Sequence, residues 1–256
     1  MGDLEECIKF FHSAVVYEVG PVTERLKTSK TWAHFADSIH HMSSLKAYKC
    51  AINLLPHLAS LDMNLQQRQE ALSQSKGLAC EAANCAIRNG ELELAIEFLS
   101  TGRSVFWAQA LHLCTPLDEL ADRLREISNI LESGSIRHNS DMISLSSGQK
   151  IDLEKQLAHY QKLNEERTNI LKEVRETKGF EDFLILKSFS KLQKAASNGP
   201  VVLLNASQQG CDTLILTTDG VTHVPLQNMK LQQVIEFAKF VQNVPGVCSN
   251  RDFSCH

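Results

Sequence analysis

This 256-residue chain contains the sequence Asn198-Gly199-Pro200-Val201-Val202-Leu203-Leu204-Asn205-Ala206, at which helical patterns are replaced by strand patterns. Its Asn-Gly-Pro sequence ends a long series of helical patterns, because glycine and proline both interrupt helices. The β-branched and apolar residues that follow, and those of 211–217 (CDTLILT), are typical of strands buried on both faces. The sequence therefore predicts a mainly α protein with a small α/β segment towards its C-terminal end.

The residues after these two strands complete that segment. Thr218-Asp219-Gly220 has the Asp-Gly signature of a tight hairpin turn. An alternating strand over 221–226 contains Pro225, which is typical of an edge strand. An amphipathic helix is expected over 229–241. About three strands result, and residues 244–256 form an irregular tail without periodicity.

Helical patterns fill the first 133 residues. Gly20-Pro21 separates two helices, Pro56 is expected to end a helix, and Asn89-Gly90 is expected to be a turn. The apolar spacing predicts helices over residues 4–15, 22–39, 45–55, 66–88, 91–111 and 117–131.

A change of composition marks the next boundary. Residues 133–148 are rich in Ser and Gly, and we place a linker at 134–149. The charged helix expected over 150–178 has fewer clean heptads than a coiled coil needs, so we expect it to lie on another domain. A further amphipathic helix is expected over 180–196. The predicted domains are a helical region at 1–133 and an α/β region at 150–243.

Composition limits the function classes. The 26 basic and 30 acidic residues give a net charge of −4, which does not indicate a nucleic-acid partner. No apolar run approaches the roughly 18 residues of a membrane span. The acidic N-terminal residues lack a secretory pattern, so we expect a cytoplasmic protein whose eight cysteines are reduced. No glycine-rich phosphate-binding motif is present, and no cofactor is expected.

Small residues at helix contacts favour a helical repeat array. Tyr48-x2-Ala51-x4-Pro56 matches the end of a tetratricopeptide repeat, and Ala83, Ala95 and Gly102 form a second candidate. The two candidates lie further apart than the normal period of about 34 residues. We therefore expect degenerate repeats that bind a protein partner.

The chain also resembles fungal proteins that join tetratricopeptide repeats (TPR) to a CHAT domain, a caspase-like module. Four segments carry the resemblance: Tyr17–Leu26, Ala47–Pro56, Ala95–Trp107 and Gly199–Leu216. The resemblance implies that the repeats bind or sense a partner and that residues 150–243 are the first part of a CHAT domain.

The resemblance further implies a cysteine peptidase with a His-Gly motif and a cysteine after a later strand. This chain contains no His-Gly dipeptide. We therefore assign no catalytic residue and expect an interaction and regulatory segment that is inactive alone. Two alternatives stay open: a divergent cysteine peptidase complete within this chain, and a pure helical scaffold. Exposed strand edges are expected to favour self-association, so residues 1–135 are expected to be more soluble than the whole chain.

Two rival cysteine–histidine sites are weighed against structural roles. Cys255-His256 lies in the irregular tail, where it has no following strand. Cys211 and His223 could meet across a hairpin, but the CHAT resemblance makes the Cys211 strand structural. Neither pair is assigned a catalytic role.

Other residues whose side chains could bind a ligand or a partner are also interpreted as structural. Metal binding is not assigned to the histidines, because His40 and His41 point to different faces of a helix; the others considered are His34 and His57. Trp107, with Phe98 and Phe106, is expected in the core. Arg103 is expected to cap a helix or to bind an acidic partner.

Overall fold

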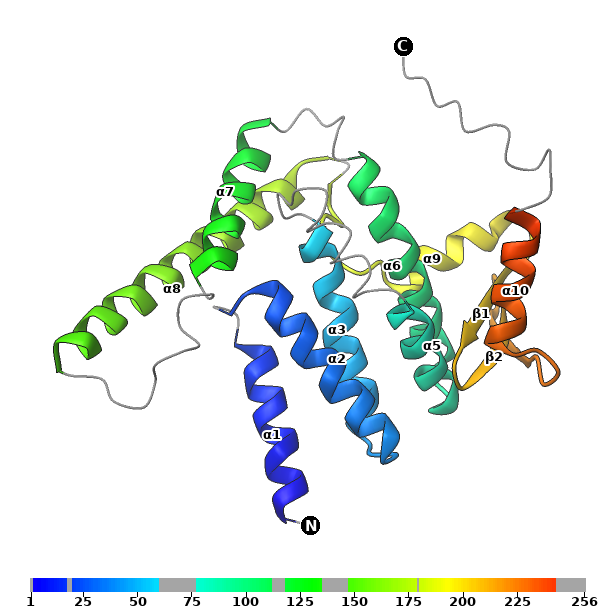
Figure 1. The fold of residues 1–256 in the computed structure, drawn as a ribbon. Helices are drawn as coiled ribbons and strands as arrows, with labels where there is room; N and C mark the ends of the chain where they lie inside the picture. The colour runs from blue at the N-terminus through cyan, green and yellow to red at the C-terminus, as the bar shows by residue number, and fades with distance from the viewer. Residues whose placement is uncertain are drawn as a thin grey trace.

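The computed structural model describes residues 2–17, 20–59, 77–111, 118–134, 147–178 and 180–242. The chain is mainly helical, with a small antiparallel sheet near its C-terminal end (Figure 1). The elements are α1 (Gly2–Val16), α2 (Val22–Ser38), α3 (Ser44–Ala59), α5 (Leu78–Arg88), α6 (Leu92–Leu111), α7 (Asp118–Gly134), α8 (Ser147–Glu176), α9 (Phe189–Gln193), the 3-10 helix η3 (Lys194–Asn198), β1 (Val201–Ser207), β2 (Gly210–Thr217), β3 (Gly220–Pro225) and α10 (Leu231–Gln242).

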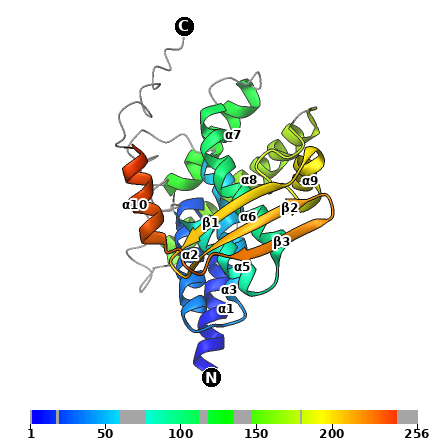
Figure 2. The ribbon, with the colours of Figure 1, turned by 90° about the vertical axis from the view of Figure 1, so that its right-hand side faces the viewer.

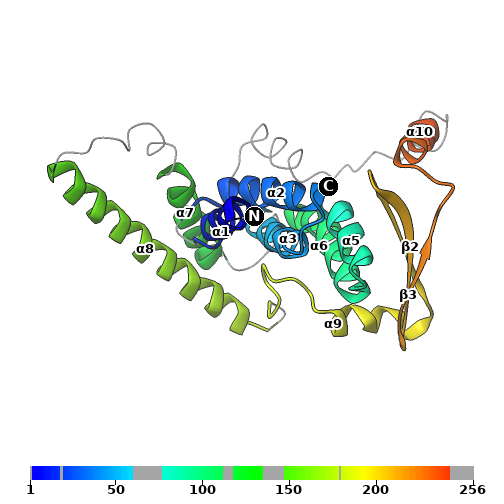
Figure 3. The same cartoon turned by 90° about the horizontal axis from the view of Figure 1, so that it is seen from below.

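The molecule has three parts that follow one another across it. In the view from below, α8 and α7 lie at one side, α1, α2, α3, α6 and α5 lie in the middle, and the sheet lies at the other side (Figure 3). A continuous apolar core joins the middle helices to the inner face of the sheet. We call α1, α2, α3, α5, α6, α9, η3 and the sheet the helix–sheet body.

The core of the helix–sheet body combines large rings with very small side chains. Trp32, Tyr48 and Phe98 are almost completely buried. Alanines with no exposed surface lie on α2, α3, α5 and α6, where they let neighbouring helices approach closely. The helical region with small residues at its contacts is therefore confirmed, and the tetratricopeptide repeats stay a prediction.

Gly102 of α6 lies where that helix closely approaches α5. A Cβ atom at this position would lie 2.3 Å from the Cβ of Ala79, well inside the contact distance of two carbon atoms. The glycine expected at a small-residue position thus has a direct steric reason.

The three strands form a meander in the order β1-β2-β3. Both hairpins are tight, since Ser207 pairs with Gly210 and Thr217 pairs with Gly220. The second hairpin confirms the predicted Thr218-Asp219-Gly220 turn, and Gly220 has a φ of +149°, which favours glycine. The edge position of β3 and the C-terminal helix are also confirmed.

The prediction that the first strand is buried on both faces is wrong. Val202 and Leu204 of β1 are 57% and 63% exposed, whereas Leu203 between them is buried. The reason is that the helices of the core pack on the inner face of the sheet, whereas Val202 and Leu204 lie on the outer face, away from them (Figure 2). An antiparallel sheet can leave one face open in this way.

Helices α7 and α8 form a second apolar cluster. It contains Leu124 and Ile127 of α7 with four residues of α8: Leu163, Ile170, Leu171 and Val174. The long charged helix therefore packs on α7, which the sequence assigned to the other domain. The domain boundaries themselves stay a prediction, and residues 135–146 of the expected linker lie outside the described residues.

Three helix predictions need correction. The helix expected over 66–88 is not continuous, because Gly77 has a φ of +80° and α5 begins only at Leu78. The expected helix over 180–196 is instead a series of turns followed by the short α9 and η3. Its apolar residues serve two cores, because Phe180 and Phe183 pack on the α7–α8 cluster while Phe189 packs on the helix–sheet body. One helix cannot reach both.

Pro56 does not end its helix as expected. It lies inside α3, which continues to Ala59. A proline inside a helix removes one backbone hydrogen bond. Burial of Leu55 and Leu58 on either side of Pro56 keeps the last turn of α3 in place. Residues 60–76 and 112–117, where further helical residues were expected, lie outside the described residues.

Candidate functional site

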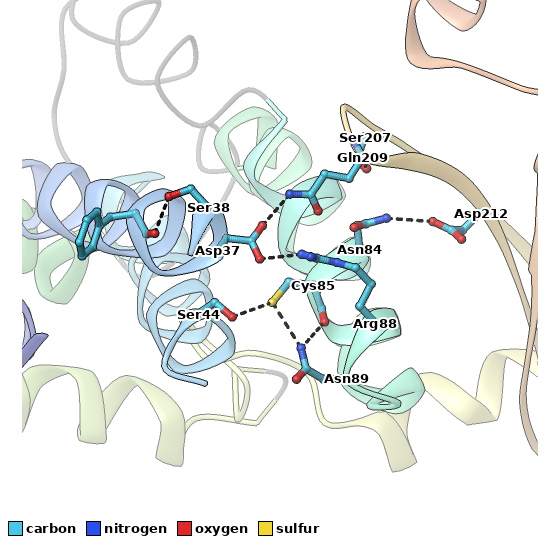
Figure 4. Close-up of polar contacts among 11 residues, drawn as sticks. Asp37, Ser38, Ser44, Asn84, Cys85, Arg88, Asn89, Ser207, Gln209 and Asp212 are labelled. Carbon is cyan, nitrogen blue, oxygen red and sulfur yellow. Dashed lines mark hydrogen bonds and ion pairs between the residues drawn. The ribbon is translucent and has the colours of Figure 1, made fainter. Parts of the chain in front are cut away.

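A cluster of polar side chains lies where the helices meet the sheet (Figure 4). It draws on the end of α2, on α5, on the β1–β2 turn and on the two strands that follow. Its members are Asp37, Asn84, Arg88, Gln209, Asp212 and His223. We call this set the junction cluster.

Asp37 is the centre of one half of the junction cluster. Arg88 Nη2 lies 2.7 Å from Asp37 Oδ1, and Gln209 Nε2 donates to Asp37 Oδ2 at 2.7 Å. The carboxylate side chain is only 7% exposed, so both oxygens have lost water and gained protein partners. Asp37 thereby ties α2 to α5 and to the turn between β1 and β2.

Asp212 is the centre of the other half. Its Oδ1 lies 2.7 Å from His223 Nε2 on β3, and its Oδ2 accepts a 3.3 Å hydrogen bond from Asn84 Nδ2. Asn84 Oδ1 is buried and has no hydrogen-bond partner among the described residues. Asn205 adds a further link, since its Nδ2 donates to the carbonyl of Cys80 on α5.

A cavity of about 940 Å³ opens beside this half of the cluster. Asn84, Arg88, Asp212 and His223 form its polar wall, and apolar residues of the α10 region, including Leu231, form the other. A carboxylate that holds an imidazole in one orientation is an arrangement that can accept or release a proton. Acyl transfer would in addition need a nucleophile within reach of that imidazole.

Cys211 and His223 both line this cavity, but their side chains are not paired with each other in the described part of the structure. Neighbouring residues of a strand point to opposite faces, so Cys211 lies on the face opposite to Asp212, which holds His223. Burial also raises the pKa of the Cys211 thiol, which disfavours the reactive thiolate. Cys255-His256 lies outside the described residues.

The other histidines that the sequence singled out are dispersed. His34 faces Glu81, and His41 bonds to Ser43. His57 accepts a hydrogen bond from Arg167. Across the described part of the chain, no three His, Cys, Asp or Glu side chains gather in a way that could hold a metal ion.

The remaining predicted residues have different outcomes. Phe98 is in the core as expected, but the side chains of Phe106 and Trp107 lie outside the described part. Arg103 does not cap a helix. Its Nη2 donates to the carbonyl of Leu204 on β1 at 3.4 Å. The cysteines Cys7, Cys50, Cys80, Cys85 and Cys211 are free thiols.

Sequence reasoning did not identify the junction cluster. Its members come from five separate segments and follow no spacing rule. The available signal was a polar residue inside an apolar stretch, as with Asn84 in Ala82-Ala83-Asn84-Cys85 and Asp212 in Cys211-Asp212-Thr213-Leu214. Such residues require a partner when they are buried.

Comparisons with protein-family models, with curated proteins and with solved structures found no match to this chain. Among the described residues, none of the helices combines the length and the apolar character that crossing a membrane requires.

Proposed function

We propose that this chain is a protein-interaction and regulatory segment of the TPR–CHAT type. The helices act as a scaffold, and the sheet presents a surface to another polypeptide. The observation that carries the proposal is the outer face of β1, where Val202 and Leu204 are exposed to solvent, whereas Leu203 on the inner face is buried in the core. Exposed apolar patches of this kind mark interaction sites.

The backbone of β1 supports the same use. Because Ser207 and Gly210 close a two-residue hairpin, alternate residues of β1 direct their N–H and C=O groups away from β2. Arg103 already donates to one of these outward carbonyls, that of Leu204. An edge with outward backbone groups can bind an added strand, and side chains such as Val202 then contact the incoming one.

The junction cluster gives this surface a fixed position. Asp37 of α2 binds α5 and the β1–β2 turn, and Asp212 of β2 binds α5, so the sheet cannot rotate on the helices without breaking several buried or part-buried polar contacts. In a TPR–CHAT architecture, such a connection would let a partner bound on the helices influence the α/β region. This is the regulatory part of the proposal.

The test measures association of the full chain. Light scattering coupled to size-exclusion chromatography should give a mass that rises above the monomer as protein concentration increases. Leu204→Lys should suppress this rise, because a charge on the outer face opposes apolar contact. The control is Leu157→Lys, which places the same charge on an exposed apolar site of α8. A strictly monomeric wild type, or equal effects of both variants, would contradict the proposal.

One observation favours the alternative of a complete cysteine peptidase, namely the Asp212–His223 pair beside a large cavity. Hydrolysis of unfolded casein by the full chain tests it. Activity that disappears in His223→Ala would support the peptidase. An inert wild type would leave the interaction segment as the better proposal.

A further inference from the structure

The cavity of about 940 Å³ beside the junction cluster has a second wall that belongs to no part of that cluster. This wall is the segment between β3 and α10 together with the first turns of α10. Its apolar side chains include Leu226, Met229, Leu231 and Ile235. The volume lies near the upper end of the range of small-ligand pockets, which is about 300–1,000 Å³.

Hydrogen bonds hold the two segments that bound this cavity. Ser207 Oγ donates to the carbonyl of Gly210 at 3.0 Å and accepts from the N–H of Gln209 at 3.2 Å, which fixes the β1–β2 turn. The N–H of Leu226 donates to the carbonyl of Cys211 at 2.9 Å, which holds the start of the apolar wall against β2. The cavity is therefore formed without a ligand, as most binding pockets are.

Opposite charges balance on the lining of the cavity. Among the described residues, its carboxylate, ammonium and guanidinium groups are those of Asp212, Lys230 and Arg88. Arg88 is paired with Asp37 at 2.7 Å, which leaves one carboxylate and one ammonium group. A charged ligand of either sign would meet a like charge as well as an opposite one, so the lining favours an uncharged ligand.

Carboxamide side chains occur on both sides of the cavity. They are those of Asn84, Gln208, Gln209, Gln227 and Gln232. Gln209 donates an N–H to Asp37 at 2.7 Å, and Gln232 donates one to Glu236 at 3.0 Å. Because only the nitrogen of a carboxamide can donate, these two contacts leave the carbonyl oxygens as acceptors. The lining thus offers uncharged donors and acceptors next to an apolar surface.

We infer that this cavity binds a short uncharged peptide segment with apolar side chains. The backbone of such a peptide carries neutral N–H and C=O groups, which match the acceptors and donors of carboxamides. Its apolar side chains would contact Leu231 and Ile235 and would be removed from water there. An apolar surface with a few fixed polar groups is the usual form of a binding pocket.

This site is separate from the outer face of β1, because neither Val202 nor Leu204 lines the cavity. Peptide binding in the cavity and self-association through the sheet are therefore independent properties. Leu204→Lys should suppress self-association and should leave the affinity for the peptide as in the wild type.

Titration calorimetry of the full chain with acetyl-leucyl-alanyl-leucine amide tests the site. Saturable binding is expected. Ile235→Asp should weaken it at least about tenfold, because a carboxylate on the apolar wall opposes the burial of leucine side chains. The matched control is Phe237→Asp, which places the same charge on an exposed apolar position of α10 that does not line the cavity. The control should keep the affinity of the wild type.

Several outcomes would overturn the inference. These are the absence of binding heat at millimolar peptide, equal affinity of wild type and Ile235→Asp, or an equal loss in Phe237→Asp. Equal affinity for acetyl-seryl-alanyl-serine amide would also overturn it, because that peptide has the same backbone without the leucine side chains.

Hydrogen exchange supplies a second measurement. Without peptide, Ile235→Asp should keep the protection of α10, which shows that the helix still forms. If it does not, Met229→Asp replaces it, since Met229 is an exposed residue of the same wall. The leucine peptide should slow exchange at the start of α10 in the wild type, and unchanged exchange there at saturation would place any binding elsewhere.

Discussion

The helix–sheet body and the α7–α8 pair are stabilised by different means. The body has one continuous core with buried aromatic rings, and the junction cluster fastens the sheet to it. The pair has a small core of six buried aliphatic residues along two helices. Its ion pairs, such as Arg123 with Glu166, are largely exposed and therefore contribute little.

Polar contacts join the two regions. Glu132 of α7 accepts hydrogen bonds from the backbone N–H groups of Val22 and Thr23 at the start of α2. Arg167 of α8 donates to His57 of α3. A long helix such as α8 can therefore be well formed and still be held to the rest of the molecule by only a few contacts. We expect the pair to open at lower free energy than the body.

Truncation of one large buried side chain in each region should give the largest effects. Trp32→Ala should lower the free energy of unfolding of the whole chain by about 3–5 kcal/mol, because it removes the largest ring of the core. Ile127→Ala should loosen α7 and α8 while α2 and α3 stay protected. Hydrogen exchange distinguishes the two results. Equal loss of protection in both regions would mean that the chain unfolds as one unit.

Acid should weaken the contact at His57. The folded pKa of about 3 lies below the unfolded value of about 6.5, so the unfolded chain takes up the proton first as the pH falls. The contribution of His57 to the free energy of unfolding is fully present above pH 6.5. Between pH 6.5 and pH 3 it falls by up to about 1.4 kcal/mol per pH unit.

Urea unfolding at a series of pH values measures this slope. His57→Gln should flatten it, because glutamine does not titrate. His159→Gln is the control, since His159 is an exposed residue of α8. An identical slope in wild type and His57→Gln would contradict the assignment.

Gly102→Ala tests the close approach inside the body. The added methyl group would overlap Ala79, and overpacking of this kind costs about 1–3 kcal/mol. Combining it with Ala79→Gly should recover much of the loss, because the second change removes the opposing methyl group. Thermal unfolding of the two single variants and the double variant measures the coupling. Additive effects would show that the two helices separate instead.

Glu132→Gln should have the smallest effect. The N-cap residue of α2 is Pro21, which makes no side-chain hydrogen bond to the helix. The carboxylate of Glu132 on α7 acts as the cap instead, and it also accepts a 2.6 Å hydrogen bond from the hydroxyl of Thr23. Loss of its charge near a helix N-terminus should cost about 1 kcal/mol. Glu126→Gln, which removes an exposed ion pair with Arg123, is the matched control. A larger loss in the control would rule out the capping role.

Local sequence patterns predicted much of the fold. Helices or strands end, as expected, at Gly20-Pro21, Asn89-Gly90 and Thr218-Asp219-Gly220. The backbone preferences of these residues act over only a few positions, so a short sequence is enough to show them. Periodicity identified the long helices for the same reason. The segment over 180–196 was mispredicted because its apolar residues contact two cores, and periodicity cannot distinguish one partner from two.

Local sequence patterns could not predict the candidate site. Asp37, Arg88 and Gln209 are separated by long stretches of chain and follow no motif. A buried polar contact depends on the distance between side chains after folding, and that distance is set by the packing of whole helices.

Local backbone and hydrophobic preferences in the sequence were enough to predict the helical character, the breaks between elements and the position of the strands. The pairing of α7 with α8 and the exposure of Val202 and Leu204 on the outer face of β1 were known only from the packed structure. These features depend on which surfaces cover one another. Burial and charge then act between residues that the sequence keeps far apart.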